Sequence, residues 1–164
     1  MPKEKKQEAR AKTVELAVGL KIPDVTAITV LQTLKRIGFG KVVNVHREDY
    51  YKFSITGEPY KFRDEIIKAD VLINANKNNF KYKLEKKQNT YSEAMIAVSN
   101  TGDDCSGLLT TLNAVGFKDI KKIERKVVWS LVIDAKSNDE AVSIAEKAAK
   151  KLLVNENYQE YEVL

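Results

Sequence analysis

The sequence predicts an α+β protein made of two tandem β-α-β-α-β modules, each a small antiparallel sheet with two helices packed on one face. Three observations predict this: matching apolar residues recur in the two halves, some segments alternate apolar and polar residues as strands do, and others have helical spacing. We expect a charged tail over residues 1–12, a first module over 13–84, a linker over 85–92 and a second module over 93–164.

The repeat is clearest around a Gly-Phe pair. Residues 31–42 (LQTLKRIGFGKV) and 109–120 (LTTLNAVGFKDI) place apolar side chains, glycine and phenylalanine at the same positions. Residues 72–74 (LIN) correspond to residues 153–155 (LVN) later in the two halves. Each module has only about 70 residues, a size at which a single core is marginal. We therefore expect the two modules to pair as an internal pseudo-dimer.

The first module reads as strand, helix, strand, helix, strand. Its first strand alternates over residues 14–20, and Asp24 or Thr26 can cap the helix that follows. Gly38 suits the left-handed residue that ends a helix. The remaining elements are marked by these apolar residues: Ala27, Val30, Leu31, Leu34 and Ile37 in the first helix, Tyr51, Phe53 and Ile55 in the long strand, Phe62, Ile66, Ala69 and Ile73 in the second helix, and Phe80 to Leu84 in the last strand.

The second module repeats this order. Gly116 ends its first helix, and the capping box Ser137–Glu140 begins its second. We expect a bend or bulge midway along each long strand, near Glu48–Asp49 and Arg125–Lys126. The apolar residues that mark the elements are Ala94, Ile96 and Val98, then Cys105, Leu108, Leu109, Leu112 and Val115, then Trp129, Leu131 and Ile133, then Ala141, Ala145, Ala148 and Leu152, and finally Tyr161 and Val163.

Composition indicates a globular protein of a reducing compartment. The formal net charge is +5, with the basic residues concentrated in residues 1–12 and 77–87, so a solvated tail is favoured over a nucleic-acid footprint. No apolar run is long enough to span a membrane, and the N-terminus is charged from its third residue, unlike a secretory signal. The single cysteine permits no intrachain disulfide, and we expect a cytoplasmic protein.

The residues that could carry chemistry are more simply interpreted as structural. His46 is the only histidine and has no accompanying carboxylate motif, so we expect no metal site. Cys105 occupies the position of Ala27 in the repeat, on a buried helix face. Residues 102–107 (GDDCSG) lack the ending of a phosphate loop and are interpreted as a helix-capping turn. We expect no catalytic residues and no cofactor.

Several motifs resemble the PurS family, the small subunit of phosphoribosylformylglycinamidine (FGAM) synthase. The family reads V-x-V-x-L-K, a D-P-x-G-x-A turn, L-G-[FY], V-x-x-V-R-x-G-K-Y and a late L-L-x-N before an aromatic strand. The corresponding segments are Val18–Lys21, Asp24–Ala27, Ile37–Phe39, Val42–His46, Tyr50–Phe53 and Val71–Asn74, with Leu152–Asn155 and Tyr161 in the second module. The resemblance covers nearly all of the chain after Lys12, once in each module.

The resemblance implies a non-catalytic subunit in de novo purine biosynthesis. It would bridge the synthetase (PurL-like) and glutaminase (PurQ-like) subunits, and tandem chains would form homo-oligomers. The candidate partner interface that the resemblance suggests is Lys21, Asp24, Arg47, Asn74, Arg125 and Asn155. A second function stays open: a regulatory domain that binds a small molecule at the module interface. Nucleic-acid binding ranks third, since it rests on the tail alone.

Overall fold

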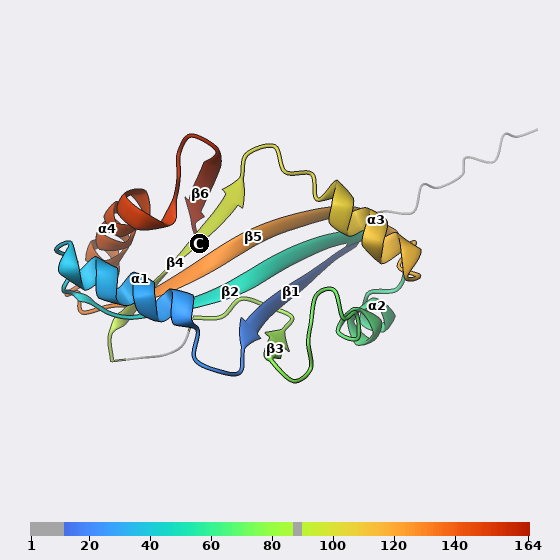
Figure 1. Cartoon of the computed structure of the whole chain (residues 1–164), viewed down its shortest axis with the longest axis horizontal. Helices are drawn as coiled ribbons and strands as arrows, with labels where there is room; N and C mark the ends of the chain where they lie inside the picture. The colour runs from blue at the N-terminus through green and yellow to red at the C-terminus, as the bar shows by residue number, and fades with distance from the viewer. Residues whose placement is uncertain (1–11, 87–89) are drawn as a thin grey trace, which may run out of the picture.

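A single antiparallel sheet of six strands organises the fold, with the strand order β3-β1-β2-β5-β4-β6 (Figure 1). The structure is a computed structural model that describes residues 12–86 and 90–164. The predicted charged tail lies outside the described residues, apart from Lys12, which begins β1. The elements are β1 (Lys12–Leu20), α1 (Val25–Arg36), β2 (Val42–Ile55), α2 (Pro59–Ile66), β3 (Asn78–Lys81), β4 (Ser92–Asn100), α3 (Ser106–Ala114), β5 (Ile120–Ile133), α4 (Asn138–Ala148), the π-helix η1 (Ala149–Leu153) and β6 (Gln159–Val163). The predicted α+β class is confirmed.

The two long strands β2 and β5 form the middle of the sheet and pair with each other over their whole length. Asp49 lies opposite Val127 at the midpoint, where the outer strands β1 and β4 stop pairing with them. The strand order of the first half, β3-β1-β2, therefore recurs in reverse as β5-β4-β6. Of the bend or bulge predicted midway along each long strand, the bulge is absent, because the β2–β5 register is continuous from Asn44 to Ser54. The register shifts in the β2–β5 pair lie near its ends, at Val42/Asn44 and Ser54/Ile55.

All four α-helices cover the same face of the sheet, in two pairs at its opposite ends (Figure 1). Alternate residues of β2 show this, since Val45 packs beneath one pair and Phe53 beneath the other. The opposite face carries a small cluster that includes Tyr50 and Met95, against which Leu84 packs.

Each hydrophobic core is built from both halves of the chain. Helix α1, from the first half, shares its core with α4 and with strands β4 and β5. Helix α3, from the second half, shares the other core with α2 and with strands β1 and β2. We had expected both helices of each half to cover that half's own sheet. The helical spacing identified the middle of each buried face correctly, but the predicted core residues at the helix ends, Ile37, Val115 and Leu152, are exposed. The spacing also did not indicate which strands the helices would cover.

Several turn predictions are confirmed. Asp24 caps α1, because its Oδ1 accepts hydrogen bonds from the backbone N–H groups of Thr26 and Ala27 at 3.0 and 3.3 Å. Gly38 and Gly116 have φ values of 108° and 111°, the left-handed conformation that ends a helix. The Ser137 hydroxyl accepts a hydrogen bond from the backbone N–H of Glu140 at 3.1 Å.

Two boundaries in the first half differ from the prediction. The second helix was expected to reach Ile73, but α2 ends at Ile66, and residues 67–73 bury Ala69, Leu72 and Ile73 within turns instead. The last strand was expected over residues 80–84. It is β3, Asn78–Lys81, because a turn closed by a hydrogen bond from the Asn78 backbone N–H to the Asn74 carbonyl starts it earlier.

Candidate functional site

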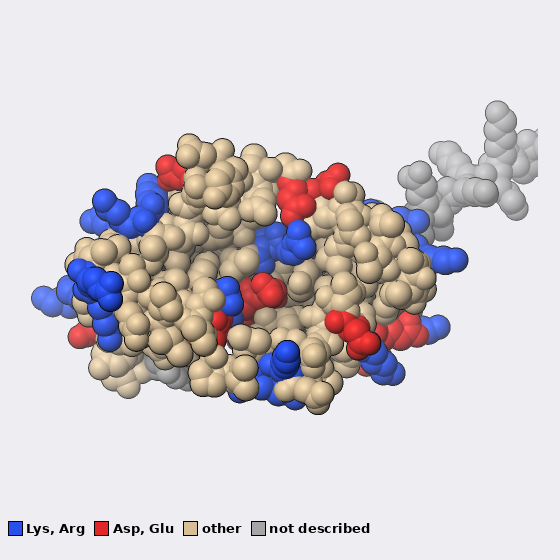
Figure 2. Space-filling view, viewed as in Figure 1, with Lys and Arg blue, Asp and Glu red and all other residues tan. Residues whose placement is uncertain are grey.

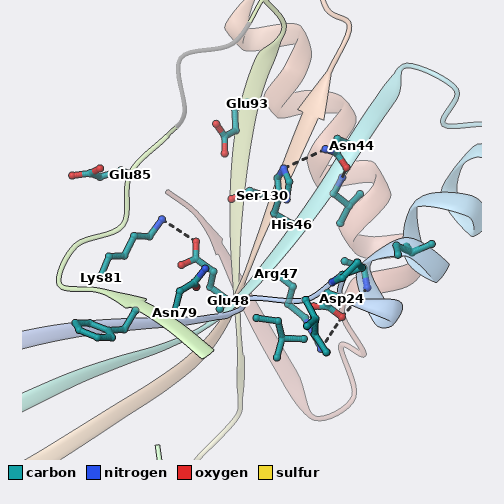
Figure 3. A pocket seen from close by; sticks show the side chains of 18 residues that line it. Asp24, Asn44, His46, Arg47, Glu48, Asn79, Lys81, Glu85, Glu93 and Ser130 are labelled. Carbon is teal, nitrogen blue, oxygen red and sulfur yellow. Dashed lines mark hydrogen bonds and ion pairs between the residues drawn. The ribbon is translucent and has the colours of Figure 1, made fainter. Parts of the chain in front are cut away.

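A cavity of about 550 Å³ lies beside the first part of β2 (Figure 3). Its size falls within the range of small-molecule sites. Both halves of the chain contribute to it. The lining residues are Gly19, Leu20, Ile22, Pro23, Asp24, Ala27, Ile28, Asn44, Val45, His46, Arg47, Glu48, Asn79, Phe80, Lys81 and Glu85 from the first half, and Glu93 and Ser130 from the second.

The cavity exists because β2 extends beyond β1. The last pair between the two strands is Val18 with Asp49, so residues 42–48 of β2 pair only with β5. The chain leaves β1 at Leu20 and turns through residues 21–24 to enter α1. The space that a longer β1 would fill is bounded instead by this turn, by β3 and by Glu85.

The floor of the cavity is polar. Glu93 and Ser130 are 8% and 5% exposed, and they are the buried polar or charged residues of the part of the chain that the structure describes. Ser130 lies opposite His46 in the β2–β5 register. The His46 ring Nε2 is 3.3 Å from the Asn44 amide nitrogen, while the Asn44 Oδ1 accepts a hydrogen bond from the Val45 backbone N–H at 2.9 Å.

The rim combines an ion pair with apolar side chains. Lys81 of β3 and Glu48 of β2 form an ion pair of 3.0 Å between Nζ and Oε1. Ile22 and Phe80 are 60% and 42% exposed, and both line the cavity, as do Leu20 and Ile28. A molecule bound here would therefore meet both charged and apolar surfaces.

A second ion pair joins the α1 cap to the sheet. The Asp24 carboxylate accepts hydrogen bonds from Arg47 Nε and Nη2 at 3.0 and 3.2 Å, so the cap of α1 also anchors that arginine. The Arg47 guanidinium lies 5.7 Å from the ring centroid of Trp129, a residue of the second half. In the second half, Asp103 pairs with Arg125 at 3.2 Å.

These two ion pairs flank a groove between the helix pairs. In the view of Figure 1, the space-filling surface is hollowed here, with charged side chains in the hollow (Figure 2). A cavity of about 250 Å³ lies in this groove, lined in part by Arg47, Asp49, Arg125 and Trp129. Burial raises the pKa of Asp49, while Arg47 and Arg125 act to lower it. The groove thus brings together two arginines that are distant in the sequence.

Residues 107–164 match the family model of PurS, described as phosphoribosylformylglycinamidine (FGAM) synthase. The match begins within α3 and runs through β5, α4 and β6 to the last residue, so β4 and the first half lie outside it. Comparison with curated proteins gave no match. The predicted relation to PurS is confirmed over the matched residues, which link this part of the chain to FGAM synthase and purine biosynthesis.

The structure brings together some of the six residues that the PurS resemblance suggested. Asp24 and Arg47 are in direct contact, and Arg125 lies across the groove from them, within the matched region. Lys21 instead contacts the turn around Ala75 in the first half, since its Nζ donates a hydrogen bond to the Ala75 carbonyl at 2.6 Å.

The two asparagines of that set shape equivalent turns in the two halves. Asn74 Oδ1 accepts from the Asn76 backbone N–H at 3.0 Å, and Asn155 Oδ1 accepts from the Asn157 backbone N–H at 3.1 Å. These contacts are structural. The Asn155 turn lines a separate, open pocket of about 600 Å³, apart from the groove and from the cavity beside β2.

Sequence reasoning missed Glu93 and Ser130. Both fall at the polar positions of alternating strands, which ordinarily face water, and nothing in their spacing distinguishes them. Among the described residues, no group of three or more His, Cys, Asp or Glu side chains is arranged to hold a metal ion. No helix in the same part of the chain is long and apolar enough to cross a membrane.

Proposed function

We propose that this chain is a non-catalytic small subunit of FGAM synthase that bridges the synthetase and glutaminase subunits in purine biosynthesis. The observation that carries the proposal is the PurS match over residues 107–164. The synthetase and glutaminase together would supply the ATP-dependent and glutamine-dependent chemistry. This chain would bind both subunits and hold them together. Its place of action would be the cytoplasm.

We further propose that the chain is a tandem duplication whose halves form an internal pseudo-dimer. The repeated β-α-β-α-β order and the reversal of the strand order about the β2–β5 pair support this. Joining two modules in one chain raises their effective concentration, which favours pairing without new contacts. Tandem chains would associate further into homo-oligomers.

Co-purification tests the bridging function. The full chain is mixed with a PurL-type synthetase and a PurQ-type glutaminase, with ATP and glutamine present, and the products of gel filtration are assayed for glutamine-dependent FGAM formation. We expect a ternary complex and activity that depends on this chain. If no complex forms with any combination of nucleotide and glutamine, the bridging function is wrong.

Two of the six suggested interface residues, Lys21 and Arg125, can be tested in the same assay. We expect the charge reversals Lys21→Glu and Arg125→Glu to weaken the complex, because both would remove a cation from the proposed contact surface. Lys147→Glu is the matched control, since this exposed lysine of α4 lines neither the groove nor the cavity beside β2. Equal retention of partners by all three variants would remove Lys21 and Arg125 from the interface.

The second function, a regulatory domain with a ligand at the module interface, has one observation in its favour. The cavity of about 550 Å³ is lined by residues of both halves, as that function requires. The two functions are compatible, because a bridging subunit can also respond to a small molecule.

A further inference from the structure

Several large apolar side chains lie exposed together where the chain passes from β1 into α1. Ile22 and Val25 are the most exposed of them, at 60% and 73%. Scattered exposed apolar residues are ordinary, whereas a contiguous apolar patch marks a surface that another molecule covers. The apolar patch consists of Leu20, Ile22, Val25 and Ile28 around this turn and of Phe80 in the neighbouring strand β3.

These side chains form one continuous surface beside a recess. All of them except Val25 line the cavity beside β2. Leu20 and Phe80 belong to β1 and β3, which pair antiparallel. Val25 lies one helical turn before Ile28 in α1, so these two side chains are neighbours on the helix surface. Because the patch borders a recess, it can receive an anchoring side chain from a protein partner, as the centres of protein interfaces do.

The fold does not require these side chains to be apolar. In the repeat, Val25 and Ile28 correspond to Asp103 and Ser106, at the polar turn that joins β4 to α3. Helix α1 packs on the sheet through other side chains, of which Leu34 is fully buried. The exposed apolar surface is therefore a feature of the first half, and its burial against a partner would stabilise a complex through the hydrophobic effect.

The rim of the patch is basic. Lys21 and Lys77 are adjacent, because the Lys21 backbone N–H donates to the Lys77 carbonyl at 2.8 Å, and both residues are exposed. Neither lysine forms an ion pair with another residue of the ranges 12–86 and 90–164. Figure 2 shows basic side chains at the lower edge of the molecule, near the place of β3 in Figure 1. Two cations thus remain available to a partner beside the apolar surface.

The carboxylates near the patch do not neutralise these lysines. Asp24 and Glu48 line the same cavity, but they are paired with Arg47 and Lys81. Glu85 lies on the opposite side of the cavity from Asp24 (Figure 3). The charge that a docking partner meets at the turn is therefore positive.

This charge distinguishes between the occupants that an apolar patch could have. A second copy of the chain would dock through the same patch under two-fold symmetry, which brings the lysine pairs of both copies into one contact. Like charges held together in this way oppose association. A different protein, in which acidic residues flank an apolar side chain, complements both the patch and its rim.

We propose that the apolar patch docks one protein partner of the chain, through an apolar or aromatic side chain seated between Ile22 and Phe80 and through acidic side chains that pair with Lys21 and Lys77. The inference rests on the proposed bridging function and names the surface that one of the two subunits occupies. Because the corresponding turn of the second half is polar, the other subunit docks at a different surface.

Binding of each subunit is measured separately to test this. The full chain is immobilised, and a PurL-type synthetase or a PurQ-type glutaminase is passed over it, with ATP and glutamine present in both cases. Val25→Asp places a charge in the patch and favours the helix dipole, since the first turn of α1 contains no acidic residue. Ile22→Asp places the same charge on the turn. We expect each variant to bind one subunit about tenfold or more weakly and the other subunit unchanged.

A control and two rim variants complete the test. Val115→Asp is the matched control, because Val115 is 64% exposed and lies at the end of α3, in the other helix pair. It should leave the binding of that same subunit unchanged. We expect Lys21→Glu and Lys77→Glu to slow association with that subunit, with a difference from the unchanged chain that shrinks as NaCl is raised. Far-UV circular dichroism verifies that each variant is folded.

The surface is wrong, and the bridging function stands, if the folded patch variants bind both subunits as tightly as the unchanged chain or lose both alike. Unchanged association of the lysine variants also overturns the proposal. So does conversion of a dimer into monomers by Ile22→Asp in gel filtration, or loss by Ile22→Asp of binding to phosphatidylserine vesicles, since the occupant is then a second copy or a membrane. If the unchanged chain binds neither subunit, the bridging function and this inference both fail.

Discussion

The substitution Leu112→Ala tests whether the two ends of the molecule unfold as one unit. Leu112 lies in α3 of the second half, is fully buried, and packs in the same core as Phe53 and Ile66 of the first half. Trp129, the only tryptophan, belongs to the core at the other end of the sheet. The mutation and its fluorescent reporter are therefore in different cores that share the long strands β2 and β5.

The expected magnitude follows from the burial of Leu112. Truncating a fully buried leucine to alanine removes transfer free energy and leaves a cavity, a cost of about 3 kcal/mol. For a chain of this size the dependence of the free energy of unfolding on urea is about 2 kcal/mol per molar. The urea midpoint should therefore fall by about 1.5 M. Because both cores pack on the same two strands, we expect both ends of the molecule to unfold in one cooperative transition.

Urea unfolding followed in parallel by Trp129 fluorescence and by far-UV circular dichroism measures this. We expect the two probes to give the same lowered midpoint in Leu112→Ala. Val115→Ala is the control, since this residue at the end of the same helix is 64% exposed and its truncation should cost less than about 0.5 kcal/mol. If Leu112→Ala lowers the circular dichroism midpoint and leaves the Trp129 midpoint unchanged, the two ends unfold independently and the shared-core argument is wrong.

Three further predictions concern single side chains. The hydrogen bond from the Cys105 backbone N–H and the ion pair with Arg125 lower the pKa of Asp103 below its ordinary value of 3.8. The ionised Asp103 carboxylate therefore stabilises the fold fully above pH 3.8, and this stabilisation is lost as the pH falls through the lowered pKa. The unchanged chain should have a higher Tm than Asp103→Asn at neutral pH, and the difference in Tm should disappear at acid pH. Ser137→Ala removes the hydroxyl that accepts a hydrogen bond from the Glu140 backbone N–H, and it should lower the free energy of unfolding, measured in urea, by about 1 kcal/mol. Ser137→Asp should retain most of the stability of the unchanged chain, because aspartate also caps helices. Burial raises the pKa of the Cys105 thiol, so Ellman's reagent should label it slowly in the folded chain and rapidly in urea; rapid labelling without urea would contradict the burial.

The local features of the fold were the predictable ones. Gly38, Gly116 and the Ser137 cap act through hydrogen bonds or backbone conformations within a few residues, so the sequence pattern alone identifies them. The exchange of α1 and α3 between the halves was not predictable in this way. Helical spacing shows that Leu34 and Leu112 are buried but contains no information about which strands cover them.

The candidate site was missed for a related physical reason. The open face of an antiparallel sheet normally meets water, so polar residues at its positions predict nothing unusual. Glu93 and Ser130 become significant only because β1 ends early and the segment after β3 returns to bound a cavity over them. Those are consequences of strand length and chain path, which emerge only when the whole sheet is assembled.

The two halves of the proposed duplication differ at positions that matter for a bridging function. In the repeat, His46 and Ser130 correspond to Glu124 and Lys52, which face each other across the β2–β5 pair as opposite charges. The exposed apolar turn around Ile22 corresponds to the polar turn around Gly102 and Asp103. Two separate identical modules would present the same surface twice, whereas one chain with two diverged halves can offer a different surface to each of two different partners. A bridging subunit that joins a synthetase to a glutaminase needs that asymmetry, and the altered positions lie at the turns and open strand ends where such partners would dock.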